Sequence, residues 1–404
     1  MPLSVSARHV LLTALVLSLP AVLPAQQDTA PRPARRDWYE SFRIRGYGQV
    51  RYNRLAESND QFVCEQCDRS IGQGGGVFIR RARIILQGQI HPRVFMYLQP
   101  DYASSVGGAQ HVAQLRDWYM DVGLDADNEF RLRVGQSKVP YSFENMQSSQ
   151  NRLPLDRADA TNSAASNERD LGVFFYWAPR HVRERFARLV SDGEKGSGDY
   201  GVFALGVFNG QTANRTEAND GQHVVARLSW PIAIGSQMIE PGVAGYTGRY
   251  VVTPEQRTAG VKGTADWNYR DERALASFVL YPRPFGLLAE YNVGRGPEYN
   301  PVTDSIETQP LQGGFVTASW RVASGEHLLF PFARWQVYDG GKKHERDARS
   351  YEVNDFEMGV EWQPSSAFEL VAAYHDGDRR FEDRQRPDNR QRGRLLRLQM
   401  QFNF

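Results

Sequence analysis

After residue 25 the sequence lacks any apolar run long enough to cross a membrane as a helix, which takes about 20 residues. It also lacks an excess of either charge, because 48 Lys and Arg face 47 Asp and Glu. A nucleic-acid-binding protein would need a basic excess, so we expect no nucleic-acid partner. Lysine itself is scarce: only five Lys occur, and the other basic residues are Arg.

Cysteine occurs only twice, as Cys64 and Cys67 in the stretch CEQC. This spacing suits a zinc site, thiol redox chemistry or a small disulfide. Because no second pair of ligands accompanies it, we expect a disulfide that stiffens a long loop in an oxidising compartment. The eight His show no ligand-like pairing, so we expect no metal site and no cofactor.

Motifs for catalysis are missing as well. The sequence has no nucleophile elbow, metalloprotease helix or phosphate-binding glycine loop at the required spacing. We therefore expect a protein that is not an enzyme. A hydrolytic barrel with a Ser and a His on its wall is the enzymatic alternative.

The first residues have the organisation of a secretory signal peptide. Arg8 precedes an apolar run from Val10 to Val22, and Ala25 is the small residue at the cleavage position. An uncleaved anchor is the alternative. The expected division of the chain is a signal peptide at 1–25, a polar periplasmic leader at 26–42 and a folded domain at 43–404.

The last residues alternate between apolar and polar side chains, which is the period of a β-strand. Leu396, Leu398, Met400, Phe402 and Phe404 share one face. Similar segments of about ten residues, the length of a tilted membrane-crossing strand, recur along the chain. We predict sixteen strands, at 43–54, 77–90, 94–101, 114–124, 130–136, 170–178, 200–208, 222–231, 238–250, 273–282, 286–294, 310–321, 328–338, 353–363, 368–375 and 394–404.

The connections between these segments are short and long in turn. Stretches such as HPR (91–93) and RPFG (283–286) alternate with long polar loops such as 137–168 and 376–393. A soluble sandwich has no reason for this asymmetry, whereas outer-membrane barrels have short periplasmic turns and long external loops. We therefore predict a transmembrane antiparallel β-barrel in the outer membrane of a Gram-negative-type bacterium.

Closure of such a barrel requires the last strand to pair with the first, because unpaired backbone groups in lipid cost several kcal/mol each. The terminal aromatics Phe402 and Phe404 resemble the signature that outer-membrane porins present to the barrel-assembly machinery. Large aromatics at strand ends are expected to form interfacial girdles in contact with outer-membrane lipids. The residues assigned to these girdles are Trp118, Tyr119, Trp177, Trp230, Tyr281, Trp320 and Trp362.

Three stretches carry a more specific resemblance. They are FIRRARIILQGQI (78–90), LRVGQSKVPYSFENMQSSQNRL (132–153) and NERDLGVFFYW (167–177), and in order and spacing they resemble the phosphate-selective porin O and P family. The resemblance implies a sixteen-stranded barrel, usually a homotrimer, that passes anions through a lumen narrowed by an inward-folded loop. We assign this constriction to loop 137–168.

Arginine is expected to line the lumen, where rings of Arg favour anions. If the apolar residues of their strands face lipid, Arg81, Arg83, Arg131 and Arg133 face the pore, together with Gln87 and Gln89. In the constriction loop, Lys138, Arg152 and Arg157 oppose Glu144, Asp156 and Asp159. Lumenal salt bridges that stiffen the barrel are the alternative role for these arginines. An acidic wall is expected opposite, at Glu290, Glu357, Glu361 and Glu369.

Family members that discriminate phosphate use lysines at the constriction, and here only Lys138 lies in a matching motif. Lys262 is a second candidate. Diffusion of small anions, phosphate or polyphosphate among them, is thus the expected function. A general, weakly selective porin and a non-conducting receptor or adhesin are the alternatives.

An insertion at 178–200 falls where a short periplasmic turn is expected. Val182, Phe186 and Leu189 recur in it at helical spacing among three Arg, which predicts a short basic amphipathic helix. Such a helix could contact a periplasmic partner or anionic lipid headgroups. An inert insertion is the alternative.

Overall fold

A computed structural model describes residues 37–63, 76–106 and 109–404 of this chain. The predicted signal peptide, most of the predicted leader, and Cys64 and Cys67 lie outside the described residues. The unit considered below is Trp38–Phe404.

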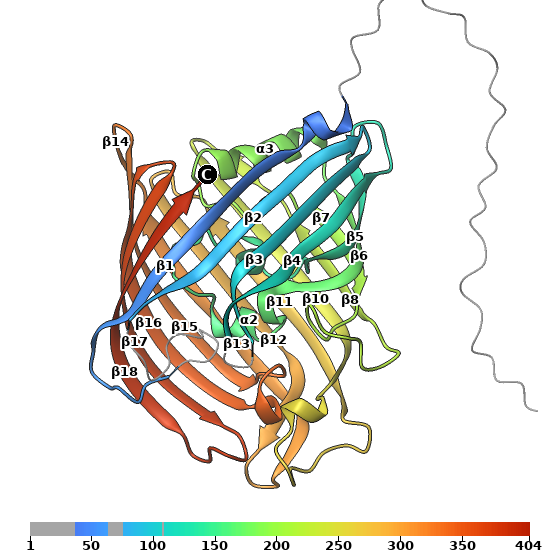
Figure 1. The fold of residues 1–404 in the computed structure, drawn as a ribbon, viewed down its shortest axis with the longest axis vertical. Coiled ribbons are helices and arrows are strands. Elements are labelled where there is room, and N and C mark those ends of the chain that lie inside the picture. The colour runs from blue at the N-terminus through green and yellow to red at the C-terminus, as the bar shows by residue number, and fades with distance from the viewer. Residues whose placement is uncertain (1–36, 64–75, 107–108) are drawn as a thin grey trace, which may run out of the picture. The chain divides into compact units, whose positions relative to one another are not determined.

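Consecutive strands pair in an antiparallel barrel, and β1 pairs with both β2 and β18, which closes it (Figure 1). Eighteen segments make sixteen strands, because β9 continues β8 along β10 and β14 continues β13 along β15. The strands are β1 (Arg43–Glu57), β2 (Val77–His91), β3 (Val94–Val106), β4 (Ala109–Gly123), β5 (Phe130–Lys138), β6 (Arg169–Trp177), β7 (Phe203–Phe208), β8 (His223–Ser229), β9 (Ile232–Ile234), β10 (Gln237–Val251), β11 (Asn268–Leu280), β12 (Phe285–Asn300), β13 (Ser305–Trp320), β14 (Val322–Ser324), β15 (His327–Gly341), β16 (Ser350–Ser365), β17 (Phe368–Glu382) and β18 (Arg390–Asn403).

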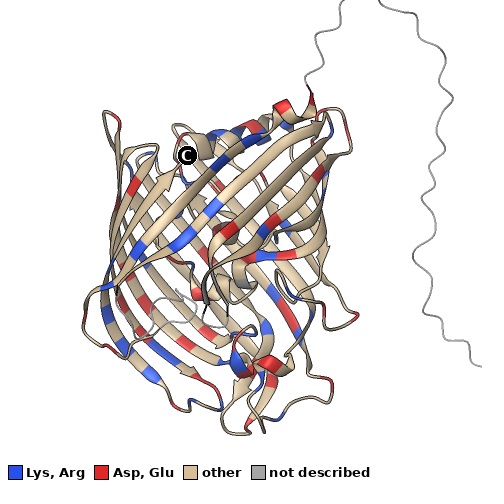
Figure 2. Cartoon of the chain, viewed as in Figure 1, with Lys and Arg blue, Asp and Glu red and all other residues tan. Residues whose placement is uncertain are grey.

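The predicted fold class, a sixteen-stranded antiparallel β-barrel, is confirmed. The predicted strands were too short on the side of the long loops. β17, for example, continues through the charged stretch 376–382, where Asp376 lies opposite Arg394 and Asp378 opposite Arg392 on β18. Charged residues of both signs lie along these strands (Figure 2). Cross-strand ion pairs therefore extend the ladder beyond the apolar band.

The helices are few and short. They are η1 (Trp38–Ser41), α1 (Phe143–Met146), α2 (Asp159–Asn162), η2 (Ser166–Glu168), α3 (Arg180–Ser191), η3 (Pro254–Gln256) and η4 (Arg346–Ala348). Among the described residues, no helix combines the length and the apolar character needed to cross a membrane.

The two faces of each strand differ in the sense expected for a membrane barrel. On β18, Leu398 and Met400 are exposed on the outer surface, whereas Arg397, Gln399 and Gln401 are buried inside. A soluble barrel would show the opposite arrangement, with its apolar residues inside.

The chain end closes the barrel through its backbone. The N–H of Gly46 donates to the carbonyl oxygen of Phe404 at 2.8 Å, and the N–H of Phe404 donates to the carbonyl oxygen of Gly46 at 3.0 Å. A Cβ atom at Gly46 would lie 2.5 Å from the Phe404 ring, so glycine lets the two strands meet. The rings of Phe402 and Phe404 are exposed on the outer surface.

Two of the predicted girdle residues face the lumen instead of lipid. Trp118 points outward, so its neighbour Tyr119 points inward, as the period of two demands. Tyr281 is buried in a cluster with Phe186 of α3. The tryptophans Trp118, Trp230, Trp320 and Trp362 are exposed on the outer face, as predicted.

Candidate functional site

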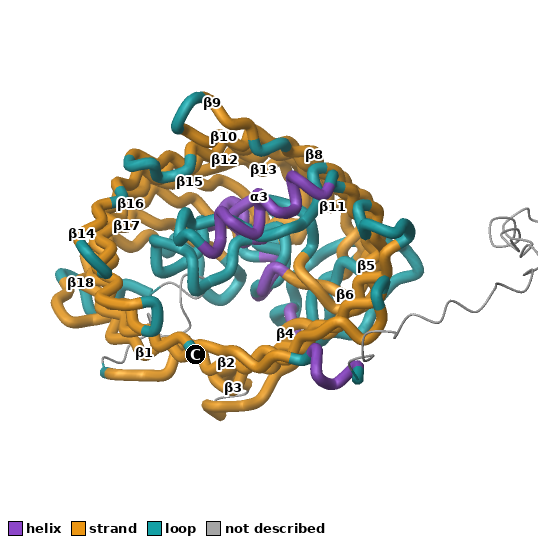
Figure 3. Tube along the Cα trace, turned by 90° about the horizontal axis from the view of Figure 1, so that it is seen from above, coloured by secondary structure: helices purple, strands orange, loops and turns teal. Residues whose placement is uncertain are grey.

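Loop 139–168 folds into the barrel and brings α1 and α2 with it. Nearly all of its described side chains are buried, including the charged Glu144, Asp156 and Asp159. Seen down the barrel, loops and short helices occupy part of the space inside the ring of strands (Figure 3). The predicted inward-folded loop is therefore present.

Three carboxylates of this loop are tethered to cations of the barrel wall. Asp156 pairs with Arg51 of β1, at 3.2 Å from Nη1 to Oδ1, and with Arg397 of β18. Asp159 pairs with Arg379 of β17, at 2.9 Å, and with Lys342 after β15. The third, Glu144, pairs with Arg334 of β15.

The expected opposition within the loop is therefore corrected: Glu144, Asp156 and Asp159 do not pair with Lys138, Arg152 or Arg157. Wall cations reach them because the loop crosses the lumen. Buried ion pairs of this kind hold geometry firmly, since removing one partner leaves an uncompensated buried charge.

The wall cations also set the ionisation of the loop carboxylates. Burial raises the pKa of Asp156, but Arg397 and Arg51 outweigh it and hold the pKa below its usual range. Asp159 behaves in the same way: burial raises its pKa, and Arg379 and Lys342 bring it below the ordinary value. Both groups are therefore anionic tethers at neutral pH.

The predicted acidic wall is largely covered by this loop. Glu290 of β12 accepts hydrogen bonds from the hydroxyl of Ser142 at 2.7 Å and from the N–H of Phe143 at 2.6 Å. Glu357 of β16 accepts a long hydrogen bond from the N–H of Leu155 at 3.4 Å. These carboxylates thus anchor the loop rather than face an open lumen.

The insertion after β6 enters the lumen from the side of the short turns. Its helix α3 carries the predicted apolar face, with Val182, Phe186 and Leu189 buried against the wall residues Val279 and Tyr281. α3 crosses the view down the barrel in Figure 3. The insertion is therefore part of the lumenal structure.

Ion pairs fix the segment that follows α3. Glu194 accepts two hydrogen bonds from Arg283, from Nε at 2.6 Å and from Nη2 at 2.7 Å. Lys195 pairs with Glu361, another member of the predicted acidic wall. This third wall carboxylate, unlike Glu290 and Glu357, is therefore held by a cation.

The basic wall lies on β1 to β5, and most of its arginines have carboxylate partners. Arg83 pairs with Asp101 at 2.8 Å, and Arg131 with Asp199 at 2.8 Å. Arg133 donates from Nε and Nη2 to the two oxygens of Asp121, at 2.7 and 2.8 Å. All three arginines thus form lumenal salt bridges, which is the alternative role considered for them.

Two wall cations are different. Arg81 is buried and donates to the side-chain oxygen of Gln49 at 2.6 Å, but it forms no ion pair with any described residue. The side chain of Arg45 on β1 makes neither a hydrogen bond nor an ion pair with the described residues. Both contribute positive charge that no neighbouring carboxylate cancels.

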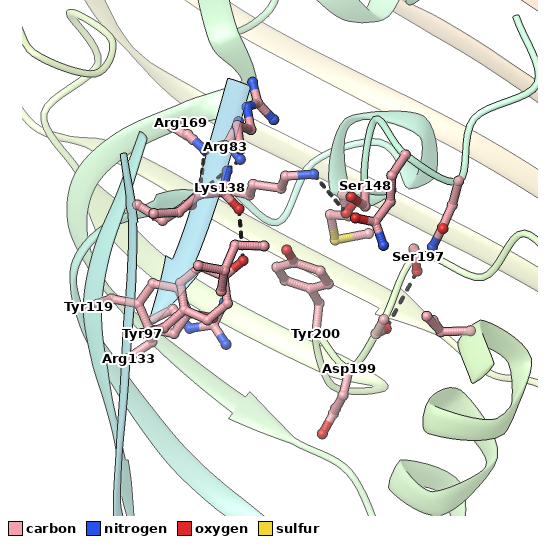
Figure 4. A pocket seen from close by; sticks show the side chains of 18 of the residues that line it. Arg83, Tyr97, Tyr119, Arg133, Lys138, Ser148, Arg169, Ser197, Asp199 and Tyr200 are labelled. Atoms are coloured by element: carbon pink, nitrogen blue, oxygen red, sulfur yellow. Dashed lines mark hydrogen bonds and ion pairs between the residues drawn. The ribbon is translucent and has the colours of Figure 1, made fainter. Parts of the chain in front are cut away.

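A cavity of about 300 Å³ lies between the basic wall, the constriction loop and the segment after α3 (Figure 4). Its cationic lining comes from Arg45, Arg83, Arg133, Lys138 and Arg169, and its carboxylates are Asp117 and Asp199. A second cavity of about 280 Å³ shares Tyr97, Tyr119, Arg133 and Asp199 with the first and adds Arg93, Arg131 and Arg183. The two adjoining cavities, together called the path, lie along the basic wall.

A family profile described as phosphate-selective porin O and P matches residues 58–404. The chain belongs to this porin family. It is an outer-membrane porin of a Gram-negative bacterium. No curated protein sequence matches the chain.

Solved outer-membrane channels share the fold at low sequence identity. The channel DcaP of Acinetobacter baumannii is 13% identical, with a TM-score of 0.55, over 90% of this chain and 97% of that one. OmpF of Salmonella typhi, solved in complex with daunomycin, is 13% identical, with a TM-score of 0.56, over the same shares. The anion-selective porin from Comamonas acidovorans is 9% identical, with a TM-score of 0.52, over 90% and 99%.

In this porin the three predicted cations of the constriction loop make different contacts. Lys138 is buried and donates from Nζ to the carbonyl oxygens of Met146 at 3.0 Å and Gln147 at 2.8 Å. Arg157 pairs with Glu168 at 3.2 Å. Arg152 is buried, and its Nε and Nη1 have no hydrogen-bond partner among the described residues.

Lys262 lies away from the other predicted pore residues. It is exposed in the loop between β10 and β11, where Nζ donates to the carbonyl oxygen of Thr303 at 3.4 Å. Its neighbour Val261 belongs to a buried cluster with Tyr250, Tyr269, Tyr299 and Ile306 of the adjacent strands, whereas Lys262 stays on the surface.

Sequence reasoning missed the lysines that do reach the interior. Lys342 and Lys343 follow β15 and are buried, Lys342 against Asp159 and Lys343 against Asp271. Burial lowers the pKa of Lys343, and the charge of Asp271 opposes this change. Their position at a strand end gave no sign that the following loop turns inward.

Replacing one tether tests the role of the loop. We expect Asp156→Asn to leave Arg51 and Arg397 without their carboxylate, at a cost of about 3–5 kcal/mol in unfolding free energy, and to raise single-channel conductance as the loop loosens. Asp266→Asn, in the exposed loop before β11, is the matched control. Equal conductance and stability in both variants would contradict the tether.

The stability difference between wild type and Asp156→Asn should also depend on pH. Because the folded pKa of Asp156 is below the unfolded value of about 4, its contribution is complete above that pH and lost as the pH falls towards the folded pKa. Unfolding measured from pH 8 to pH 3 should show a constant difference down to about pH 4. A difference that shrinks already between pH 7 and pH 5 would exclude this ionic tether.

Proposed function

We propose that this outer-membrane porin lets small anions diffuse along its arginine-lined wall. The observation that carries the proposal is that lumenal arginines, among them Arg45, Arg81 and Arg152, form no ion pair with a described carboxylate. Uncompensated charge in a narrow polar passage favours ions of opposite sign. Arginine also keeps its charge when buried.

The disposition of the acidic groups supports the same function. Glu290, Glu357 and Glu361 are engaged with the constriction loop and with Lys195, and none of the three lines the two cavities. The cavities adjoin the opposite wall, which carries the arginines. The linings of the two cavities together hold eight cations (Arg45, Arg83, Arg93, Arg131, Arg133, Lys138, Arg169 and Arg183) and three carboxylates (Asp117, Asp121 and Asp199), so an anion there would meet more cations than carboxylates.

Phosphate and polyphosphate are proposed solutes because of the family name. The residues favour small anions as a class: lysines do not gather at the cavity, where Lys138 is the only Lys of its lining. Arginine offers a planar fork that suits both phosphate and carboxylate oxygens.

A general porin with weak selectivity is the second candidate. It is favoured by the pairing of Arg83, Arg131 and Arg133 with carboxylates, which cancels most of the charge on the basic wall. The two candidates differ in whether the unpaired arginines determine the ion selectivity of the channel.

Conductance separates them. In a planar bilayer under a KCl gradient we expect a reversal potential that favours chloride, and we expect Arg45→Gln to lower this preference by about fivefold, because one charge about 4 Å from an ion in water contributes roughly 1 kcal/mol. Arg180→Gln, on the exposed face of α3, is the matched control. Titrated phosphate should block the chloride current if phosphate binds.

A reversal potential near zero in wild type, unchanged by Arg45→Gln, would establish the weakly selective porin instead. Absence of any conductance would contradict both candidates and support a non-conducting receptor or adhesin.

We also propose that the porin is a homotrimer, as the family resemblance implies. Native mass spectrometry of the detergent-purified protein should give the mass of three chains. A single-chain mass under conditions that preserve the barrel would contradict this proposal.

The exposed rings of Phe402 and Phe404 are proposed as the signal read by the barrel-assembly machinery. Phe404→Ala should lower the amount of folded barrel in the outer membrane, measured by heat-dependent gel mobility. Tyr291→Ala, which removes an exposed ring on the outer face of β12, is the control. Equal yields of the two variants would contradict the signal.

A further inference from the structure

The larger cavity contains aromatic rings as well as cations. Tyr97 of β3 and Tyr119 of β4 are stacked with their ring centroids 5.0 Å apart and their planes at 11°. Tyr200, from the segment after α3, also lines the cavity, and Figure 4 shows its ring opposite the other two. The cavity is thus bounded by tyrosine rings from the wall on one side and from the insertion on the other.

Arg133 links these rings. Its guanidinium carbon lies 3.9 Å from the ring centroid of Tyr119, 5.0 Å from that of Tyr176 and 5.3 Å from that of Tyr200. Asp121 holds the same guanidinium through two hydrogen bonds. The tyrosines therefore stand in a fixed arrangement around a paired, and hence neutralised, cation.

The hydroxyl groups of two tyrosines are free to bind a solute. Tyr97 donates to the side-chain oxygen of Gln99 at 2.8 Å. The hydroxyls of Tyr119 and Tyr200, in contrast, have no hydrogen-bond partner among the described residues, although both side chains line the cavity. Two hydroxyl donors, and the rings that carry them, thus line the same cavity as Arg45.

Apolar atoms complete the lining. Ile85 of β2, Met146 of α1 and Val190 of α3 border the same cavity. Its volume is at the lower end of the range of about 300–1,000 Å³ that small-molecule sites occupy. An inorganic anion would gain nothing from the rings or from these apolar groups, whereas an organic anion with a flat apolar body would use both.

We propose that this cavity is a binding site for aromatic carboxylates, whose charge is drawn to Arg45 and whose ring stacks against the tyrosines. This inference rests on the proposed anion-diffusion function and narrows its solute class. The carboxylate and the ring have to be recognised together, because the cationic and the aromatic linings face the same space.

Block of the chloride current by two matched acids tests the inference. Benzoate and cyclohexanecarboxylate carry the same charge and differ in the aromatic face. We expect benzoate to half-block the wild-type current at about fivefold lower concentration, the gain that an aromatic pair provides. Tyr200→Leu should abolish this difference, Tyr200→Phe should keep most of it, and Tyr291→Leu, on the outer face of β12, should leave it unchanged.

The outcomes distinguish this inference from the function on which it rests. Chloride preference with equal block by the two acids overturns the aromatic site and leaves the anion porin standing. A wild-type channel without anion preference overturns the proposed function, and with it the inference. Loss of the difference in Tyr291→Leu as well would also overturn the site, since that ring is far from the cavity lining. Tyr119→Leu provides a second lumenal variant if Tyr200→Leu does not assemble.

Discussion

The lumen of this porin depends on the ionic attachment of one loop to the barrel wall. Glu144, Asp156 and Asp159 carry three buried negative charges into the barrel, and cations from β1, β15, β17 and β18 meet them. Water fills an untethered sixteen-stranded barrel. The loop would otherwise have no reason to leave the external surface, because its own polarity suits solvent. The attachment therefore determines both the width of the path and the side of the barrel on which it runs.

The wall that the loop covers also determines which charged residues border the path. The loop rests on the wall that carries Glu290 and Glu357, and its backbone N–H groups satisfy those carboxylates. The insertion with α3 approaches from the opposite end and engages Glu361 through Lys195. The space left over borders β1 to β5, where the arginines lie. The proposed anion selectivity thus follows from which wall is covered, even though the chain as a whole is almost neutral.

The sequence was enough to predict the parts of this structure that depend on strand period. Alternation in the last strand, continued by the alternating short and long connections, identified sixteen strands and their lipid-facing side. The same period places Tyr119 inside once Trp118 is outside, so the assignment of Tyr119 to the lipid-facing girdle contradicted the pattern itself. The places of Lys342, Lys343 and Tyr200 were not predictable, because they lie in irregular segments whose path is set by contacts with residues distant in sequence.

The preference for arginine over lysine has a physical basis in this arrangement. Burial disfavours the charged form of a lysine, and Lys342 and Lys343 each lie directly against a buried carboxylate. Arginine needs no such partner to stay charged. A lumen that uses uncompensated cations to attract anions must therefore build them from arginine. Arg81 fits this part of the proposed function, because it is buried and forms no ion pair with a described residue, so only a side chain that stays charged without a partner could attract anions there.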